Sequence, residues 1–261
     1  MPRPTLVLAA LLASTTMATS SAPAAEAFHG EYTISFLGIT VARSSFDSRY
    51  EGDKYTIDGR ASAAGLALIF DDTTGTLTAS GRFSRAGIQP QAFRADYTSG
   101  KKVSMVDIRF SGGAVSSSKV LPPPKPRGDD WLPLDAGDLK GVADPIGATV
   151  IRADSLDEVC GRTVKMYDGE MRANLVLTPV SKGKMAVKGY QGPTVTCLMT
   201  FQPVSGYAQR RKALKFLRDR SKIMVTFAPL GQTGIYAPIH ATVGTEIGTI
   251  TVKARRFEAK S

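Results

Sequence analysis

Short runs in which apolar and polar residues alternate recur through most of the chain, and they constrain the fold more than any other feature. In one such run, Tyr32, Ile34 and Phe36 alternate with polar residues ahead of Gly38. Successive side chains of a β-strand point to opposite faces, so a period of two predicts strands buried on one face. Strands separated by glycine-rich turns roughly every 8 to 12 residues predict an all-β fold.

The turn sequences predict that neighbouring strands pair as antiparallel hairpins. Turn-forming residues separate the alternating rows in YEGDKY, TSGKK, YDGE, SKGK and PLGQTG. We interpret SKGK, residues 181–184, as a turn that leads to the row of Met185 and Val187. We therefore expect a mainly β fold: an antiparallel, strongly curved open sheet or half-open barrel with one or two short helices.

One segment interrupts the strand pattern. LPPPKPRGDDWLP, residues 121–133, contains five prolines and the only tryptophan of the chain. Proline fixes φ and lacks a backbone donor, so this segment is expected to be a stiff crossover. A short helix is predicted immediately afterwards, in DLKGVADPIGA at 138–148. The crossover separates two β-rich halves, 28–120 and 148–261, which we expect to form a single domain over 28–261.

The N-terminus has the pattern of a cleaved signal peptide at residues 1–27. Arg3 supplies a positive charge, Leu6 to Leu12 form a short apolar stretch, and AEA at 25–27 suits signal peptidase. We predict cleavage ahead of Phe28 and export to the periplasm of a Gram-negative bacterium. No later stretch approaches the roughly 18 apolar residues of a spanning helix, so no permanent anchor is expected.

The chain has two cysteines, Cys160 and Cys197, and an even count in an oxidising compartment predicts a disulfide. In the predicted strands, Cys197 lies on the same face as Val195 and Phe201, and Cys160 lies on the same face as Val164. Both sulfur atoms are therefore expected to face apolar neighbours, as in a structural bridge. A redox pair would need a low-pKa thiolate, usually within C-x-x-C, and the sequence has no such motif.

A basic segment, YAQRRKALKFLRDRSK at 207–222, is predicted to form an amphipathic helix. Ala213, Leu214, Phe216 and Leu217 lie on one side of a helical repeat. Seven cations occupy the rest of its surface: Arg210, Arg211, Lys212, Lys215, Arg218, Arg220 and Lys222. The formal net charge of +10 favours anionic partners. The segment is interpreted either as a docking face for an anionic membrane or partner, or as the solvated face of a packed helix.

Residues suited to catalysis are sparse. The chain holds only two histidines: His29 beside the predicted cleavage site, and His240, which its parity assigns to the surface. The sequence contains neither a G-x-S-x-G nucleophile elbow nor a phosphate-binding loop. With so few histidines and cysteines, a zinc site of the usual composition is not expected. We therefore predict no metal and no cofactor.

Five segments carry a resemblance to a known family: YTISFLGITVARS, GRASAAGL, ADPIGA, CGRTVKMYDGEMRANLVL and VTFAPLGQTGIYAPIHATVGTEIGTI. Together they resemble an uncharacterised, domain-of-unknown-function family of exported bacterial proteins of about this length. The resemblance implies a periplasmic, β-rich protein and brings no catalytic residues. The general pattern is also similar to the half-open β-barrels that carry lipoproteins and lipids through the envelope, a likeness of fold that does not give function.

These observations predict a non-enzymatic protein of the cell envelope that binds an amphiphilic or anionic component, such as a lipid, lipoprotein or lipopolysaccharide. Apolar rows of a curved sheet would shield acyl chains, and the basic segment would make peripheral contact with an anionic membrane. Export argues against nucleic acid as a partner. Two alternatives stay open: a purely structural envelope protein, and a hydrolase of an envelope polymer that uses carboxylates such as Asp71/Asp72 or Asp129/Asp130.

Overall fold

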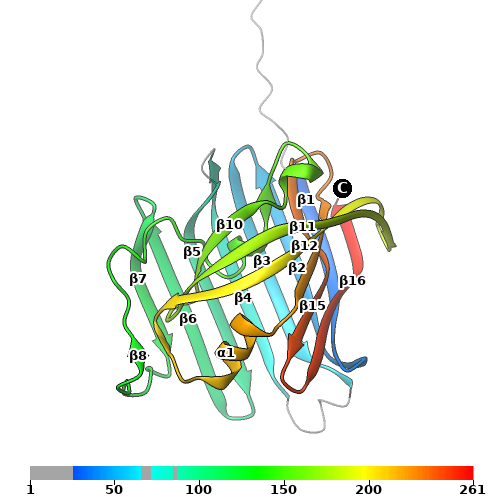
Figure 1. Cartoon of the computed structure of the whole chain (residues 1–261). Helices are drawn as coiled ribbons and strands as arrows, with labels where there is room; N and C mark the ends of the chain where they lie inside the picture. Colours follow the sequence, from blue (N-terminus) through cyan, green and yellow to red (C-terminus); the bar gives the residue numbers. More distant parts are fainter. Residues whose placement is uncertain (1–25, 66–71, 85–86, 261) are drawn as a thin grey trace, which may run out of the picture.

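The computed structural model describes residues 26–65, 72–84 and 87–260, which form a mainly β, antiparallel structure with one short α-helix (Figure 1). The predicted fold class is therefore confirmed, while most of the predicted signal peptide lies outside the described residues. The N-terminal strands are β1 (Glu26–Phe36), β2 (Ile39–Glu51), β3 (Lys54–Ala63), β4 (Thr74–Ser84), β5 (Gly87–Ser99), β6 (Lys102–Ser111) and β7 (Ala114–Leu121). The C-terminal strands are β10 (Arg162–Tyr167), β11 (Arg172–Val187), β12 (Tyr190–Ser205), β14 (Ile223–Pro229), β15 (Ile235–Thr245) and β16 (Gly248–Lys260).

A single sheet of 14 strands contains both β-rich halves of the chain. Its order is β10-β11-β12-β14-β15-β16-β1-β2-β3-β4-β5-β6-β7, with β9 (Ile151–Arg152) paired to β15 off this path. The first strand, β1, pairs antiparallel with the last, β16, and this pairing joins the two halves. In Figure 1 the sheet curls, so that β10 to β12 cross in front of β2 to β6.

The chain between the two halves fills part of the curl. Residues 142–151, here called the interior segment, are largely buried, and Val142 and Val150 belong to a core cluster with Tyr55, Ile108 and Ile239. A second core cluster lies under β10, β11, β12 and β14. It includes Ala148 and Ile151 of the interior segment, which therefore contributes to both clusters. Apolar residues on the inward strand faces and on this segment thus form the core.

The structure corrects the helix predicted at 138–148. Only a short 3-10 turn, Gly147–Thr149, forms there, and Gly141 adopts a positive φ of 63°. Pro145 disfavours helical backbone at Asp144, which precedes it, so an α-helix cannot run through this segment. The crossover itself contains a turn at Asp129–Asp130 and the short strand β8 (Trp131–Leu132), which pairs with β13 (Tyr207–Ala208).

The turn predicted at 181–184 is also wrong. Strand β11 continues through these residues, with a shift of register between Pro179 and Ser181. The reversal comes at Lys188–Gly189, since Val187 pairs with Tyr190. Gly189 has a positive φ of 82°, the conformation that a tight hairpin turn requires and that glycine adopts without strain. The glycine inside SKGK instead continues the extended strand.

The predicted basic helix is present but shorter than 207–222. Helix α1 spans Lys212–Asp219, because Tyr207 and Ala208 pair with β8 and Arg211 remains extended. Leu214 is buried and Leu217 packs on the second core cluster, so α1 covers part of the sheet. No helix in the described part of the chain is long and apolar enough to cross a membrane.

Candidate functional site

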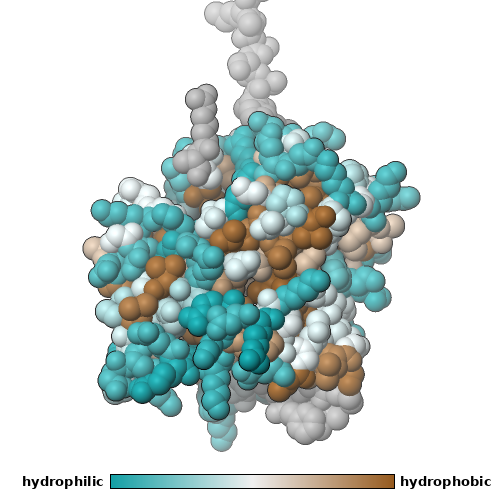
Figure 2. Space-filling view, viewed as in Figure 1, coloured by the Kyte–Doolittle hydropathy of each residue, from teal (hydrophilic) through white to brown (hydrophobic). Residues whose placement is uncertain are grey.

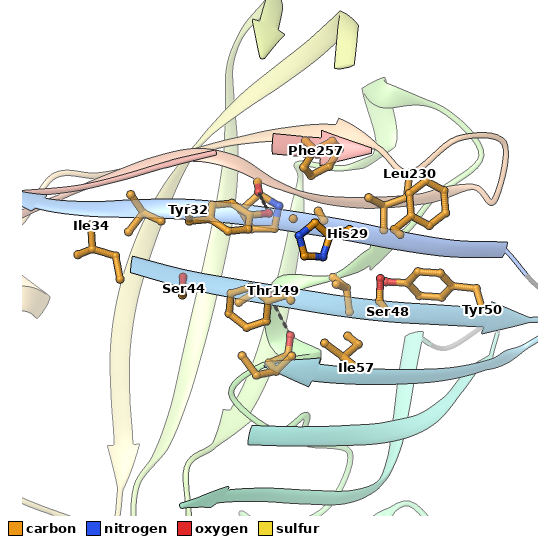
Figure 3. A pocket seen from close by; sticks show the side chains of 18 residues that line it. His29, Tyr32, Ile34, Ser44, Ser48, Tyr50, Ile57, Thr149, Leu230 and Phe257 are labelled. Carbon is orange, nitrogen blue, oxygen red and sulfur yellow. Dashed lines mark hydrogen bonds between the residues drawn. The ribbon is translucent and has the colours of Figure 1, made fainter. Parts of the chain in front are cut away.

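An apolar cavity of about 280 Å³ lies inside the curl of the sheet (Figure 3). Its walls come from the inward faces of β1, β2, β15 and β16 and from the interior segment. Large apolar and aromatic side chains dominate its lining, notably Phe28, Tyr32, Phe46, Tyr50, Leu230 and Phe257. The volume is close to the lower end of small-molecule pockets, about 300–1,000 Å³. The cavity is thus large enough for a small apolar group.

Small residues at inward positions keep this cavity open. Gly30 of β1 pairs with Phe46 of β2 on one side and with Phe257 of β16 on the other. Because Gly30 has no side chain, it leaves space between these two aromatic residues for the ring of Tyr32. Ser44 and Ser48, two positions to either side of Phe46 on β2, also line the cavity. The cavity therefore exists because glycine and serine occupy inward positions at which a filled core would have larger side chains.

Several contacts fix the side chain of Tyr32 in the cavity. Its ring lies over Gly30, where an added Cβ would come within 2.9 Å of Cε2 of Tyr32. The ring packs edge-to-face on Phe46, with centroids 5.8 Å apart. Its hydroxyl donates a 2.9 Å hydrogen bond to the carbonyl oxygen of Pro238. Burial raises the pKa of Tyr32, and the nearby Tyr50 raises it further, so the phenol stays neutral.

A second apolar hollow, the α1 groove, opens between helix α1 and the ends of strands β1, β15 and β16, with a volume of about 490 Å³. Ala213 and Phe216 of α1 line it opposite Phe36 of β1. Ile34 lines both the cavity and the α1 groove. Inward-facing residues of β1 line first the cavity and then the α1 groove. A continuous apolar surface therefore leads from the interior toward α1.

The seven cations predicted from the sequence lie on or next to α1, but two of them are engaged in ion pairs. Arg210 pairs with Asp129 at 2.7 Å, and its backbone N–H donates to Asp130 at 3.1 Å. Arg218 pairs with its neighbour Asp219 at 2.7 Å. The other five are exposed and have no ion pair within the described ranges: Arg211, Lys212, Lys215, Arg220 and Lys222. These five give the region its available positive charge.

The predicted disulfide is confirmed. Cys160 and Cys197 are bonded, with Cα atoms 5.8 Å apart and a sequence separation of 37. Both are buried in the second core cluster beside Val159 and Val195. The bridge attaches the chain that follows the interior segment to strand β12. Its surroundings are those of a structural bond, as the parity of the apolar residues indicated.

The candidate acids have separate structural roles. Asp71 lies outside the described residues, and Asp72 accepts a 2.7 Å hydrogen bond from the backbone N–H of Gly100. Hydrogen bonds from Arg210 hold the pKa of Asp130 below its usual range. The acid that the sequence did not single out is Asp144, which is fully buried in the interior segment.

Asp144 acts as a backbone cap. Its Oδ1 accepts hydrogen bonds from the backbone N–H groups of Ile146 at 2.9 Å and Gly147 at 2.8 Å. Its Oδ2 has no partner among the described residues, and neither has the buried hydroxyl of Tyr55. Burial raises the pKa of Asp144 to about 6, although the hydrogen bonds from Gly147 and Ile146 oppose the shift. The carboxyl group thus caps the turn, while burial disfavours its charged form.

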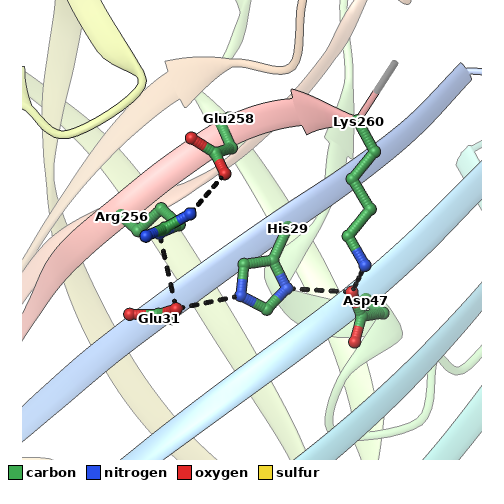
Figure 4. A network of polar contacts seen from close by, with 6 residues as sticks. All are labelled: His29, Glu31, Asp47, Arg256, Glu258 and Lys260. Carbon is green, nitrogen blue, oxygen red and sulfur yellow. Dashed lines mark hydrogen bonds and ion pairs between the residues drawn. The ribbon is translucent and has the colours of Figure 1, made fainter.

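The two histidines occupy different surroundings. His29 lies in a network on the outer face of β1 and β2, where it contacts Asp47 at 2.9 Å and Glu31 at 3.2 Å (Figure 4). Arg256 and Lys260 of β16 pair with the same two acids. His240 is half-buried rather than exposed as predicted; burial lowers its pKa, with a smaller effect from Lys253. No group of three metal-ligating side chains occurs in the described part of the chain.

Sequence reasoning expected an apolar concavity in a curved sheet but did not locate this cavity, although a signal for its position exists. In FHGEYTI and RSSFDSRY the residues of inward parity alternate between large aromatics and glycine or serine: Phe28, Gly30, Tyr32 on one strand and Ser44, Phe46, Ser48, Tyr50 on the other. Two neighbouring strands that share this alternation leave gaps between the rings. The pairing register brought these gaps together, and the sequence alone does not give that register.

Comparisons with known proteins place the chain in a family. No curated protein matches it. Among solved structures, it is similar to a β-barrel-like protein of domain of unknown function DUF1849 from Brucella abortus, at 12% sequence identity and a TM-score of 0.47, over 91% of this chain and 98% of that chain. The model of a family described as a protein of unknown function, DUF3108, matches residues 31–255. The chain therefore belongs to the DUF3108 family.

Proposed function

We propose that this protein is a non-enzymatic periplasmic binding protein that holds the apolar part of an amphiphilic envelope component, such as a lipid or the acyl chains of a lipoprotein or lipopolysaccharide. The observation that carries the proposal is the cavity of about 280 Å³, whose wall continues through Ile34 into the α1 groove. An acyl chain needs a long apolar surface and few polar partners, and this pair of hollows offers both.

The polar end of such a ligand would meet the cations around α1. Lys212, Lys215 and Arg220 line a hollow that shares Phe216 and Glu246 with the α1 groove. A phosphate or carboxylate group held there would leave its apolar chain beside the groove. Lipid, lipoprotein and lipopolysaccharide share this arrangement of an anionic group on acyl chains, so the proposal names their common chemistry.

The cavity favours binding over catalysis. The Tyr32 hydroxyl is already hydrogen-bonded, and burial raises the pKa of Tyr50 to about 12. Catalysis by acid and base needs groups that titrate near the working pH, within reach of the substrate. Neither phenol meets that need, and Asp72, Asp129 and Asp130 have structural partners elsewhere.

Binding of a fluorescent long-chain fatty acid to the purified protein tests the proposal. Ser44→Phe should fill the cavity and weaken binding by about tenfold or more, on the scale of 1.4 kcal/mol per factor of ten. Ser45→Phe is the matched control. It is the same change one residue along β2, on the opposite face, where Ser45 pairs with Glu31 and Arg60. The control should bind like the natural protein; equal binding by both variants, or no binding by the natural protein, would refute the proposal.

A further inference from the structure

Two hairpin turns at one end of the sheet expose large aliphatic side chains. Leu37 and Ile39 flank the β1–β2 turn with exposed fractions of 63% and 51%, and Ile247 in the β15–β16 turn is 78% exposed. We call these three residues the apolar ledge. Exposed turns normally carry polar residues, so three adjacent aliphatic side chains require an explanation.

The two turns form one surface. The backbone N–H of Leu37 donates a 3.1 Å hydrogen bond to the carbonyl oxygen of Thr249. A Cβ at Gly248 would lie 2.6 Å from Cδ2 of Leu37, so the leucine side chain covers the start of β16. Pairing of β1 with β16 extends to Phe36 and Ile250, directly beside both turns. The ledge is therefore a continuous feature of the sheet end.

Leu37 adopts a backbone conformation that leucine disfavours. Its φ is +49°, and it is the only non-glycine residue with a positive φ in the ranges that the structure describes. Asparagine and glycine are the usual residues in this region, because a Cβ with a larger side chain clashes with the backbone there. A strained residue that also exposes an apolar side chain points to a function for that side chain.

Positive charge lies next to the ledge. Ile247 lines the α1 groove with Phe216 and Leu217 of α1. Lys212, Lys215 and Arg220 surround the adjoining hollow, as described above. In Figure 2, hydrophilic teal surface over α1 borders a brown area near the end where β15 and β16 meet. The ledge and the cations therefore belong to one face.

We infer that this face docks on an anionic lipid bilayer, with the apolar ledge inserted among the acyl chains and the cations of α1 at the headgroups. Peripheral proteins bind membranes by this combination of inserted apolar side chains and nearby basic residues. The same charge distribution disfavours a neutral protein surface as the partner, since the cations would be desolvated without compensation. Docking requires only the apolar ledge and the cations of α1, so it goes beyond the proposed ligand binding. It would also place the α1 groove against the membrane.

Co-sedimentation with vesicles of phosphatidylglycerol or phosphatidylcholine tests the inference. The natural protein should bind phosphatidylglycerol vesicles at low salt, bind them less at high salt, and bind phosphatidylcholine weakly. Leu37→Asn combined with Ile247→Ser should reduce binding by about tenfold. Asparagine suits the positive φ at position 37, so this variant should keep or improve its thermal stability. Lost vesicle binding in a stable protein would therefore report on the side chains and not on folding.

Variants that remove positive charge, with a matched control, complete the test. Lys212→Gln with Lys215→Gln should weaken binding to phosphatidylglycerol by about tenfold. Lys54→Gln with Lys184→Gln removes the same charge from exposed positions; Lys54 adjoins the β2–β3 turn, at the opposite end of β2 from Leu37. This control should bind normally. Absence of vesicle binding by the natural protein, or equal binding by all variants, would overturn the inference.

The two proposals fail separately. The fatty acid assay is run without vesicles, and Ser44→Phe, which changes the cavity but neither the ledge nor the cations, should leave vesicle binding unchanged within about twofold. Vesicle binding without fatty acid binding would reject the carrier function and keep the docking face. Fatty acid binding without vesicle binding would reject the docking face and keep the carrier.

Discussion

The hydroxyl of Tyr32 in β1 donates a 2.9 Å hydrogen bond to the carbonyl oxygen of Pro238 in β15, and strand β16 lies between the two. Ala254 of β16, which pairs with Tyr32, is buried. The bond therefore connects strands that are not neighbours. It fixes the Tyr32 ring, which lies over Gly30, in the wall of the cavity.

Tyr32→Phe should lower the free energy of unfolding by about 1–2 kcal/mol, because it leaves the Pro238 carbonyl without its partner in an apolar cavity. Urea denaturation of the two proteins measures the difference. Tyr97→Phe is the control, since Tyr97 is exposed and its change should fall within about 0.5 kcal/mol. A Tyr32→Phe protein as stable as the natural one would mean that this carbonyl finds another donor.

The disulfide should make a large contribution to stability. Its two cysteines are 37 residues apart, and the chain-entropy model assigns about 4 kcal/mol to a closed loop of roughly this length. Replacing both Cys160 and Cys197 by alanine should therefore lower the melting temperature by several degrees or more. Reduction of the natural protein under mild denaturant should give a similar loss. A double variant that melts with the natural protein would contradict this estimate.

The hairpins were predictable because their determinants are local. The glycines of TSGKK and YDGE mark turns, and alternation on either side fixes which residues face inward, so these hairpins occur as expected. The wrongly predicted turn has a non-local cause. SKGK resembles a turn, but pairing with β12 across a bulge at Pro179 keeps β11 extended. Tertiary pairing overrides local preference there, and no short window contains that information.

The site was predictable only in part, for the same reason. The cations of 210–222 are contiguous in sequence, so their clustering was evident before the structure. The cavity instead depends on β1 pairing with β16, more than 200 positions away along the chain, as in Gly30 with Phe257. Asp144 was likewise missed as a buried acid, because nothing in ADPIGA shows that this segment lies inside the sheet.

Asp144→Asn should change how stability depends on pH. Burial raises the pKa of Asp144 to about 6 in the folded protein, above its ordinary value of 3.8. The folded state then binds a proton more tightly than the unfolded state. The stability from this group is fully present below about pH 4 and is lost as the pH rises through about 6. Asparagine keeps the Oδ1 acceptor for Ile146 and Gly147 and carries no charge.

The free energy of unfolding of Asp144→Asn, relative to that of the natural protein, should therefore increase by up to about 3 kcal/mol as the pH rises from about 4 to 7. Unfolding of both proteins in urea across this range measures the difference between them. Acids elsewhere, such as Asp107, whose pKa is lowered chiefly by Arg109, affect both proteins equally, and their effects cancel in the difference. A difference that stays constant with pH would show that Asp144 does not titrate in this window.

The last prediction concerns Gly30 and the Tyr32 ring above it. An alanine at position 30 would place its Cβ 2.9 Å from Cε2 and 3.2 Å from the hydroxyl oxygen of Tyr32. The ring would have to move, with loss of its hydrogen bond to Pro238, so Gly30→Ala should destabilise the protein by about 1–3 kcal/mol. It should also weaken fatty acid binding, because the displaced ring would enter the cavity.

The sign of this effect should reverse once the ring is gone. In a Tyr32→Ala background the added methyl group meets no ring, and alanine in a strand is more stable than glycine by about 0.5–1 kcal/mol. Gly30→Ala should then be neutral or stabilising, so the two changes should show strong coupling in a double-mutant cycle. Additive effects would mean that Gly30 is required by the backbone itself. In that case the cavity would owe its shape to strand geometry and not to the space that glycine gives to Tyr32.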